Sequence, residues 1–501
     1  MMDFVSVRAK VVTDATGAVA EIPVILTSDG PLQSLVDYLL WHRHDRSPSW
    51  MRKVVQDVGL LLTYMKSNAE HFSSLDALFH TFAQRLYSGT VGEEGIDPSG
   101  LYWRPQKQRV VSDILTRLSA FSDWVADRQG TQPLNPLRSA SRYDEMVSIA
   151  AWEHRRSRAF LGHSWTNATQ DSPLRARSTQ ARRNPKIGLE DDAIAFPEKH
   201  FSDLLLNGFV RWGGAGKTDP AQRLNLRDCL ITLLMHGAGF RLSECMHLWV
   251  CDVRPDPIDP TVALVLIHHP SEGEAPDDWL DERGNPIKCN RAAYLAGRYA
   301  LKPRNELVDH RSAGWKDPSL DGKYFMQAYW FPKELGRIFL RLWNLYLLQL
   351  VEIERFHPFA FVVEDRATAG SLYCINHYNR AHGRAIKRIG LVVAKANGTT
   401  PHAHRHAFGR RLMRAGIDPQ LRQKALHHKS IQSQLVYTAP NSADVSKALE
   451  EATATLDALS AEGRSVKPDL DMDKLLAYGF SDVDPDGLLS GPNPKFKPRK
   501  A

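Results

Sequence analysis

Three segments of the chain carry arginine, histidine and tyrosine side chains of the kinds that suit chemistry at a phosphate group. The first contains Arg241, the second contains His402 and Arg405, and the third contains His428 with Tyr437 nine residues later. Arginine offers a permanent charge with paired N–H donors, histidine can move a proton near neutral pH, and tyrosine carries a nucleophilic hydroxyl. Each residue alone would be an ordinary surface or core residue, so the fold must bring them together.

Local sequence signals predict how the first two segments hold their side chains. A helix pattern ends at Gly237 and Gly239, which favour helix termination, so Arg241 is expected to project from a tight turn. Pro401 is typical of a helix start and Gly416 of a helix stop. His402 and Arg405 are three residues apart in this predicted helix, so they can face the same site.

Taken together and in order, the three segments resemble the catalytic boxes of the tyrosine recombinase (phage integrase) family. Residues 241–244 (Arg-Leu-Ser-Glu) resemble the family's Arg-x-Ser-Glu turn, and residues 401–406 (Pro-His-Ala-His-Arg-His) resemble its Pro-His-x-x-Arg-His box. Residues 426–428 (Leu-His-His) resemble its Leu-Gly-His box, which precedes the nucleophile at the spacing that Tyr437 shows. One such box is weak evidence, whereas three in the family's order are specific.

The sequence departs from the family pattern in two places. His427 occupies the position of the usual glycine, a change that is expected to affect a helix end and no catalytic group. The family also uses a lysine on a β-hairpin between the first two boxes. Lys323 is the predicted equivalent because residues 322–332 resemble the family's Gly-Lys segment that runs into a strand, and Lys288 and Lys302 are the competing candidates.

The resemblance implies roles for the charged side chains around a cleaved phosphodiester. Arg241 and Arg405 would donate hydrogen bonds to the non-bridging oxygens, where charge builds up during attack, and His428 would add a further donor. Glu244 would orient these arginine and histidine side chains from behind.

The resemblance also assigns the proton transfers and the assembly. Tyr437 would be the nucleophile, His402 its general base and Lys323 the acid that protonates the leaving 5′ oxygen. The family stores bond energy in a 3′-phosphotyrosyl link and acts as a homotetramer on double-stranded DNA, so no cofactor and no metal are expected.

Hydrophobic periodicity predicts a mainly α fold with a small β-sheet (α+β), in which a helical core-binding domain precedes the catalytic domain. The helical domain resembles the family's only in size, helix content and position. The predicted parts are an N-terminal β-hairpin (1–30), a helical DNA-binding domain (31–165), a basic linker (166–194), a catalytic domain (195–440) with an insertion at about 270–321, and a C-terminal helix with a disordered tail (441–501).

The predicted linker is polar, lacks an apolar period and is rich in basic residues. It is either a solvated connector or a strap that lies on the phosphate backbone of DNA. Its candidate DNA-binding residues are Arg175, Arg177, Arg182, Arg183 and Lys186.

The composition is compatible with a DNA-binding protein but does not require one. The 501 residues include 64 Lys plus Arg against 57 Asp plus Glu, for a net charge of +7, which allows contact with nucleic acid. The five cysteines form no CxxC pair, which argues against a zinc ribbon and suits a reducing compartment. No signal peptide and no apolar run of about 18 residues is evident, so a cytoplasmic protein without membrane contact, nucleoid-associated when bound to DNA, is expected.

Three rival interpretations remain open. His402 and His406, at i and i+4, could bind zinc in a metal hydrolase, although no HExxH motif is present. The chain could instead be a catalytically inactive DNA-binding protein of the same fold, or a type IB topoisomerase. The sequence does not give the target site, and a role in a mobile element is an expectation only.

Overall fold

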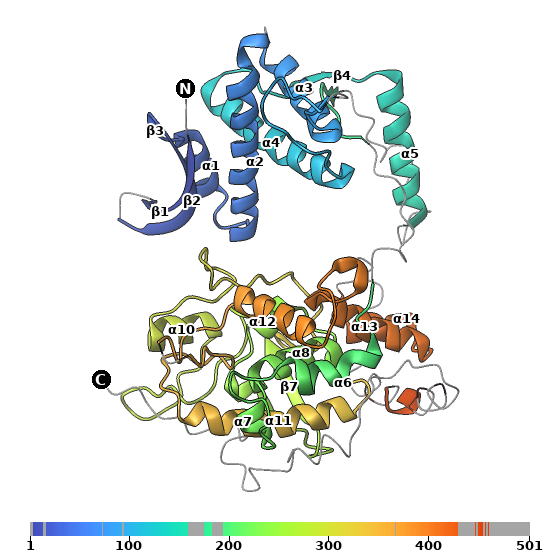
Figure 1. Ribbon diagram of the computed structural model, residues 1–501. Coiled ribbons are helices and arrows are strands. Elements are labelled where there is room, and N and C mark those ends of the chain that lie inside the picture. The colour runs from blue at the N-terminus through green and yellow to red at the C-terminus, as the bar shows by residue number, and fades with distance from the viewer. Residues whose placement is uncertain are drawn as a thin grey trace. The chain divides into compact units, whose positions relative to one another are not determined.

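The computed structural model divides into two units, residues 1–187 and 188–501, and in each unit more residues lie in helices than in strands (Figure 1). The predicted fold class, mainly α with small β-sheets, is confirmed. The structure describes residues 4–13, 17–72, 74–92, 95–158, 175–182, 194–365 and 367–428, together with 446, 449–453, 456 and 459. Within these residues, no helix has the length and apolar character needed to cross a bilayer.

The first unit packs a small sheet against a group of helices. Strands β1 and β2 form an antiparallel hairpin in which Val5 pairs with Leu26, and β3 adds a short third strand. The apolar faces of the helices meet in a core that includes Leu39, Phe79 and Phe82, as expected for amphipathic helices. Its elements are β1 (Val5–Val12), β2 (Val19–Thr27), β3 (Gly30–Pro31), α1 (Gln33–Trp41), α2 (Pro48–Asn68), η1 (Ala69–His71), α3 (Leu75–Ser88), α4 (Gln108–Gln129), β4 (Leu137–Ser139), α5 (Arg142–Arg158) and β5 (Arg175–Arg177).

The predicted linker is not a free connector between residues 175 and 182. Strand β5 pairs with β4, and Asn135 and Thr179 exchange hydrogen bonds between side chain and backbone. Arg177 is held in an ion pair with Asp123, so its charge is already neutralised inside the first unit. The polar composition did not indicate that β5 pairs with β4, which lies far from it in the sequence. This part of the linker prediction is therefore wrong.

The second unit is built around α8 (Leu226–Ala238), which packs against α11 (Glu334–Val351) and α13 (Pro401–Arg414) (Figure 1). Every residue of α8 is buried, and its polar side chains have partners there, such as the ion pair between Arg227 and Asp228. Antiparallel strands β6, β7 and β8 form a small sheet with β7 in the centre. The other elements are η4 (Glu198–His200), α6 (Phe201–Asp203), η5 (Leu204–Gly208), α7 (Pro220–Arg223), α9 (Leu242–Cys245), η6 (Val250–Asp252), β6 (Val253–Pro255), β7 (Ala263–His268), α10 (Arg291–Tyr299), β8 (Phe325–Gln327), α11 (Glu334–Val351), α12 (Ile375–Arg388), η7 (Lys395–Asn397), α13 (Pro401–Arg414) and α14 (Pro419–Ala425).

The long polar segment between β7 and β8 is folded onto the second unit and contains α10. Two buried arginines fix it there. Arg291 forms an ion pair with Asp252 and lies over the ring of Trp249. Arg304 donates hydrogen bonds to three backbone carbonyls, those of Met246, Arg311 and Tyr373. The insertion therefore has a defined path that can place its own residues at a functional site.

Candidate functional site

Arg241 and Arg405 meet at a buried carboxylate. Gly239 ends α8 with a φ of 73°, and a side chain at this position would overlap the ring of Phe408. The turn then places Arg241 at the start of α9, where its backbone N–H donates to Oε2 of Glu244 at 2.7 Å and its guanidinium bonds the other carboxylate oxygen. Glu244 is fully buried, and its Oε2 also lies 3.8 Å from Nη1 of Arg405. This geometry fits the orienting role expected for Glu244.

Arg405 joins the three sequence segments. It lies on α13, is 4% exposed, and donates hydrogen bonds to the carbonyls of Gly239 and Leu426. Burial lowers the pKa of Arg405 to about 10, and the charge of Glu244 opposes that shift, so the guanidinium stays charged at neutral pH. A single side chain thus ties the turn before Arg241 to the segment that leads to His428.

His402 and His428 lie within the field of the two arginines. Partial burial, followed by the charges of neighbouring groups that include Arg405 and Arg241, lowers the pKa of each imidazole to about 4. Both residues remain among the exposed residues of the surface, so substrate can reach them. Both side chains are therefore neutral at pH 7, and His402 can accept a proton there.

Lys316, which the sequence analysis did not consider, lies near enough to His402 for its charge to lower the pKa of that imidazole. Its side chain is exposed. Its neighbour Trp315 packs edge-on against His247 and His269, with ring centroids 5.5 and 5.3 Å apart. A tryptophan within a polar, charged insertion was the available sign that this segment is anchored. Lys323 lies exposed in the turn before β8.

A buried chain of three histidines holds the helix that carries His402 and Arg405. Nδ1 of His404 lies 3.1 Å from Nδ1 of His236 on α8, and its Nε2 lies 2.9 Å from Nε2 of His382 on α12. His236 also bonds Glu198, which forms an ion pair with Arg411. The chain locks α8, α12 and α13 together behind the site.

The histidine pattern does not favour the metal interpretation. His404 is fully buried, whereas His402 and His406 lie together with ring centroids 4.5 Å apart. His402 and His406 therefore form a pair that His404 does not join. Within the residues that the structure describes, no three His, Cys, Asp or Glu side chains gather in a way that could hold a metal ion.

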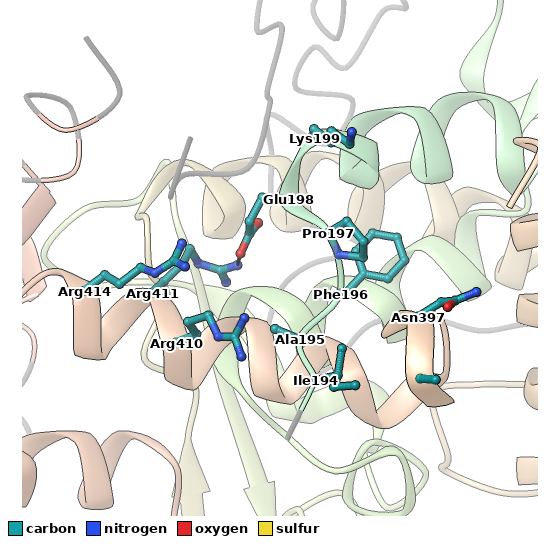
Figure 2. Close-up of a pocket in the computed structure, with 11 residues that line it drawn as sticks. Ile194, Ala195, Phe196, Pro197, Glu198, Lys199, Asn397, Arg410, Arg411 and Arg414 are labelled. Carbon is teal, nitrogen blue, oxygen red and sulfur yellow. Dashed lines mark hydrogen bonds and ion pairs between the residues drawn. The ribbon is translucent and has the colours of Figure 1, made fainter. Parts of the chain in front are cut away.

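A cavity of about 400 Å³ lies beside α13 (Figure 2). Arg410, Arg411 and Arg414 project from the helix along it, and Arg411 reaches Glu198. None of the predicted catalytic residues lines this cavity. We therefore place the candidate site at the exposed surface around Arg241 and Arg405.

The remaining predicted residues are placed as follows. Tyr437, Arg183 and Lys186 lie outside the described residues, as does most of the predicted C-terminal helix and tail. Arg175 is exposed, and Arg182 lies over the ring of Tyr87 in the first unit. A contact of these two arginines with DNA stays a prediction.

Comparison with known proteins gives a family and two relatives. A model described as the phage integrase family matches residues 367–444, which include the positions of His402, Arg405, His428 and Tyr437 but not Arg241 or either lysine. Proteins described as integrase/recombinase from Escherichia coli and Pseudomonas aeruginosa are each 22% identical over 344 residues, covering 62% of this chain and 93% of the relative. The integrase from mycobacterium phage Brujita aligns over 89% of this chain and 97% of its own at 12% identity, but the TM-score of 0.26 is too low to show a shared arrangement.

Proposed function

Because this chain belongs to the phage integrase family, we propose that it is a site-specific DNA recombinase that cuts and rejoins strands through a 3′-phosphotyrosyl link to Tyr437. The observation that carries the proposal is the pair of arginines that meets at Glu244 with His402 and His428 beside it. Such a cluster neutralises a phosphodiester and stabilises the charge that develops on its oxygens.

The proposed reaction begins with proton removal from Tyr437. A tyrosine hydroxyl has a pKa near 10, so forming the phenolate at pH 7 costs about 4 kcal/mol. His402 is neutral and can take the proton as the oxygen attacks phosphorus. The bond from phosphorus to the 5′ oxygen breaks, and its electron pair goes to that oxygen, which takes a proton from a lysine ammonium group. The phosphotyrosyl bond preserves the energy needed to rejoin a partner strand, without ATP.

Assembly and biological use form part of the same proposal. Exchange of strands between two duplexes needs several active sites, which fits a homotetramer on double-stranded DNA. We include use by a mobile element in the proposal, and the description of two relatives as integrase/recombinase supports it. The first unit would bind one side of the duplex and the second unit would supply the chemistry.

The proposal is tested by trapping the covalent product. The full chain is incubated in chelator with nicked duplexes from DNA that flanks its own gene, and a denaturing gel is followed by digestion and sequencing of the DNA-linked peptide. A retarded band whose peptide contains Tyr437 is expected. Tight binding without a band would instead support a DNA-binding protein, relaxation of supercoiled DNA without any site would support a topoisomerase, and a band lost in chelator would support a metal enzyme.

We further propose Lys316, in place of Lys323, as the acid for the leaving oxygen. General acids contribute about 100-fold or more, so Lys316→Ala is expected to slow cleavage by about 100-fold while Lys323→Ala stays near wild type. A substrate with sulfur in place of the 5′ bridging oxygen has a leaving group that needs no proton. It should restore cleavage by Lys316→Ala, and the reverse pattern for the two variants would return the role to Lys323.

A further inference from the structure

His427 occupies the position where the family pattern has glycine, and its backbone explains why glycine suits the position. It follows α14 with a φ of 52°, in the left-handed region that side chains rarely adopt. Its N–H donates to the carbonyl of Lys424, and that of His428 donates to Gln423, which closes the helix end. A histidine in this conformation needs compensating contacts, and a strained non-glycine residue beside a site points to a functional constraint.

The imidazole of His427 has those contacts. It is 1% exposed and lies between two nearly parallel rings, that of Phe240 with centroids 5.1 Å apart and that of Tyr329 with centroids 5.9 Å apart. Its Nε2 lies 2.9 Å from Oδ2 of Asp321, and because a carboxylate only accepts hydrogen bonds, the proton is on Nε2. Tyr329 Oη and the backbone N–H of Gln327 also donate to Asp321.

Asp321 is an ionised anchor in this cluster. Burial would raise the pKa of its carboxyl group, but the hydrogen bonds from His427, Tyr329 and Gln327 hold that pKa below its usual value. A hydrogen bond to a buried carboxylate is stronger and more directional than one between neutral groups. The hydrogen bond from His427 therefore holds the insertion segment at Asp321 as well as the imidazole ring.

These contacts join three parts of the candidate site through one residue. Phe240 directly precedes Arg241, and His427 directly precedes His428. The backbone N–H of Ser319 donates to the carbonyl of His427 at 3.1 Å. Ser319 and Asp321 belong to residues 316–323, which carry Lys316 and Lys323.

We propose that His427 is a positioning residue, which holds residues 316–323 against the arginine pair so that a lysine of this segment reaches the leaving 5′ oxygen. The proposal rests on the proposed function. It assigns to His427 a role in one step, proton delivery to the leaving group, and it holds whichever of the two lysines supplies the proton.

The test compares His427→Gly with His427→Gln on the oxygen and sulfur substrates. Glycine relieves the backbone but removes the imidazole, whereas glutamine keeps an N–H donor that can reach Asp321. Loss of a residue that orients a reacting group typically costs about 10–100-fold, so His427→Gly should slow cleavage of the oxygen substrate by that factor and His427→Gln by less than about fivefold. The sulfur substrate should bring His427→Gly back to within about threefold of wild type, as it does the lysine variant.

Ala300→Gly is the matched control, since Ala300 also has a φ of 52° at the end of a helix and lies outside these contacts. Asp321 keeps its bonds from Tyr329 and Gln327 without His427, so His427→Gly is expected to fold, which its melting temperature checks. Wild-type cleavage of the oxygen substrate by His427→Gly, or equal slowing on both substrates, would overturn the positioning role. Absence of any covalent product with wild type would instead overturn the proposed function, and the positioning role with it.

Discussion

Tyr437→Phe is expected to abolish the covalent product, lowering its rate of formation by about 10⁴-fold or more, because loss of a nucleophile removes the reaction path itself. Phenylalanine removes only the hydroxyl group and keeps the aromatic ring. The groups proposed to hold the phosphate, Arg241 and Arg405, are unchanged in this variant. DNA affinity, measured by gel shift at fixed salt, should therefore stay within about threefold of wild type, since affinity is dominated by phosphate contacts.

The outcome of this substitution separates an enzyme from a binding protein. If wild type and Tyr437→Phe bind DNA equally and only the phenylalanine variant gives no covalent band, Tyr437 is assigned as the nucleophile. Tyr373→Phe is a suitable control, because Tyr373 is a buried tyrosine of the same unit that packs against the guanidinium of Arg227. A covalent band that persists in Tyr437→Phe would contradict the assignment of Tyr437.

Local signals in the sequence predicted the elements that carry the site. The helix begins at Pro401, and the left-handed Gly416 follows its end at Arg414. The strand pattern of residues 261–269 became β7. These features depend on backbone preferences and on hydrophobic periods within a few residues, which a single sequence displays. The turn before Arg241 was predicted on the same basis, from the glycines that end α8.

Features that depend on contacts between distant segments were not predicted. Lys316 lies far from His402 in the sequence, and its place depends on how Arg291 and Arg304 pin the insertion. Arg177 lies in a stretch whose composition predicts a connector, yet Asp123 and strand β4 hold it. Composition reports solvation and charge, but it does not say which distant partner a charged residue will find.

The contacts of His427 could not be predicted from the sequence either. A histidine in place of glycine at a helix end indicates only a change of backbone preference. Its contacts with Phe240, Tyr329 and Asp321 come from two segments far from it in the sequence, and together they bury a side chain that precedes a site residue. The departure from the family pattern is therefore compensated by these contacts.

Arg405→Ala is expected to lower covalent product formation by about 1,000-fold, near the upper end of what one lost oxyanion donor costs. The loss is large because Arg405 would both stabilise the transferred phosphate and hold the carbonyls of Gly239 and Leu426, which precede Arg241 and His428 in the sequence. Arg405→Lys keeps a positive charge but cannot span both carbonyls, since an ammonium group lacks the planar fork of a guanidinium. Arg405→Lys should therefore form the covalent product no more than about tenfold faster than Arg405→Ala.

Single-turnover rates on saturating nicked duplex, with melting temperatures for each variant, check this prediction. Arg414→Ala is the control on the same helix, because Arg414 is exposed in the last turn of α13. It should cleave at the wild-type rate. Full activity of Arg405→Lys would show that charge alone is required, and would remove the argument that one guanidinium joins the three segments.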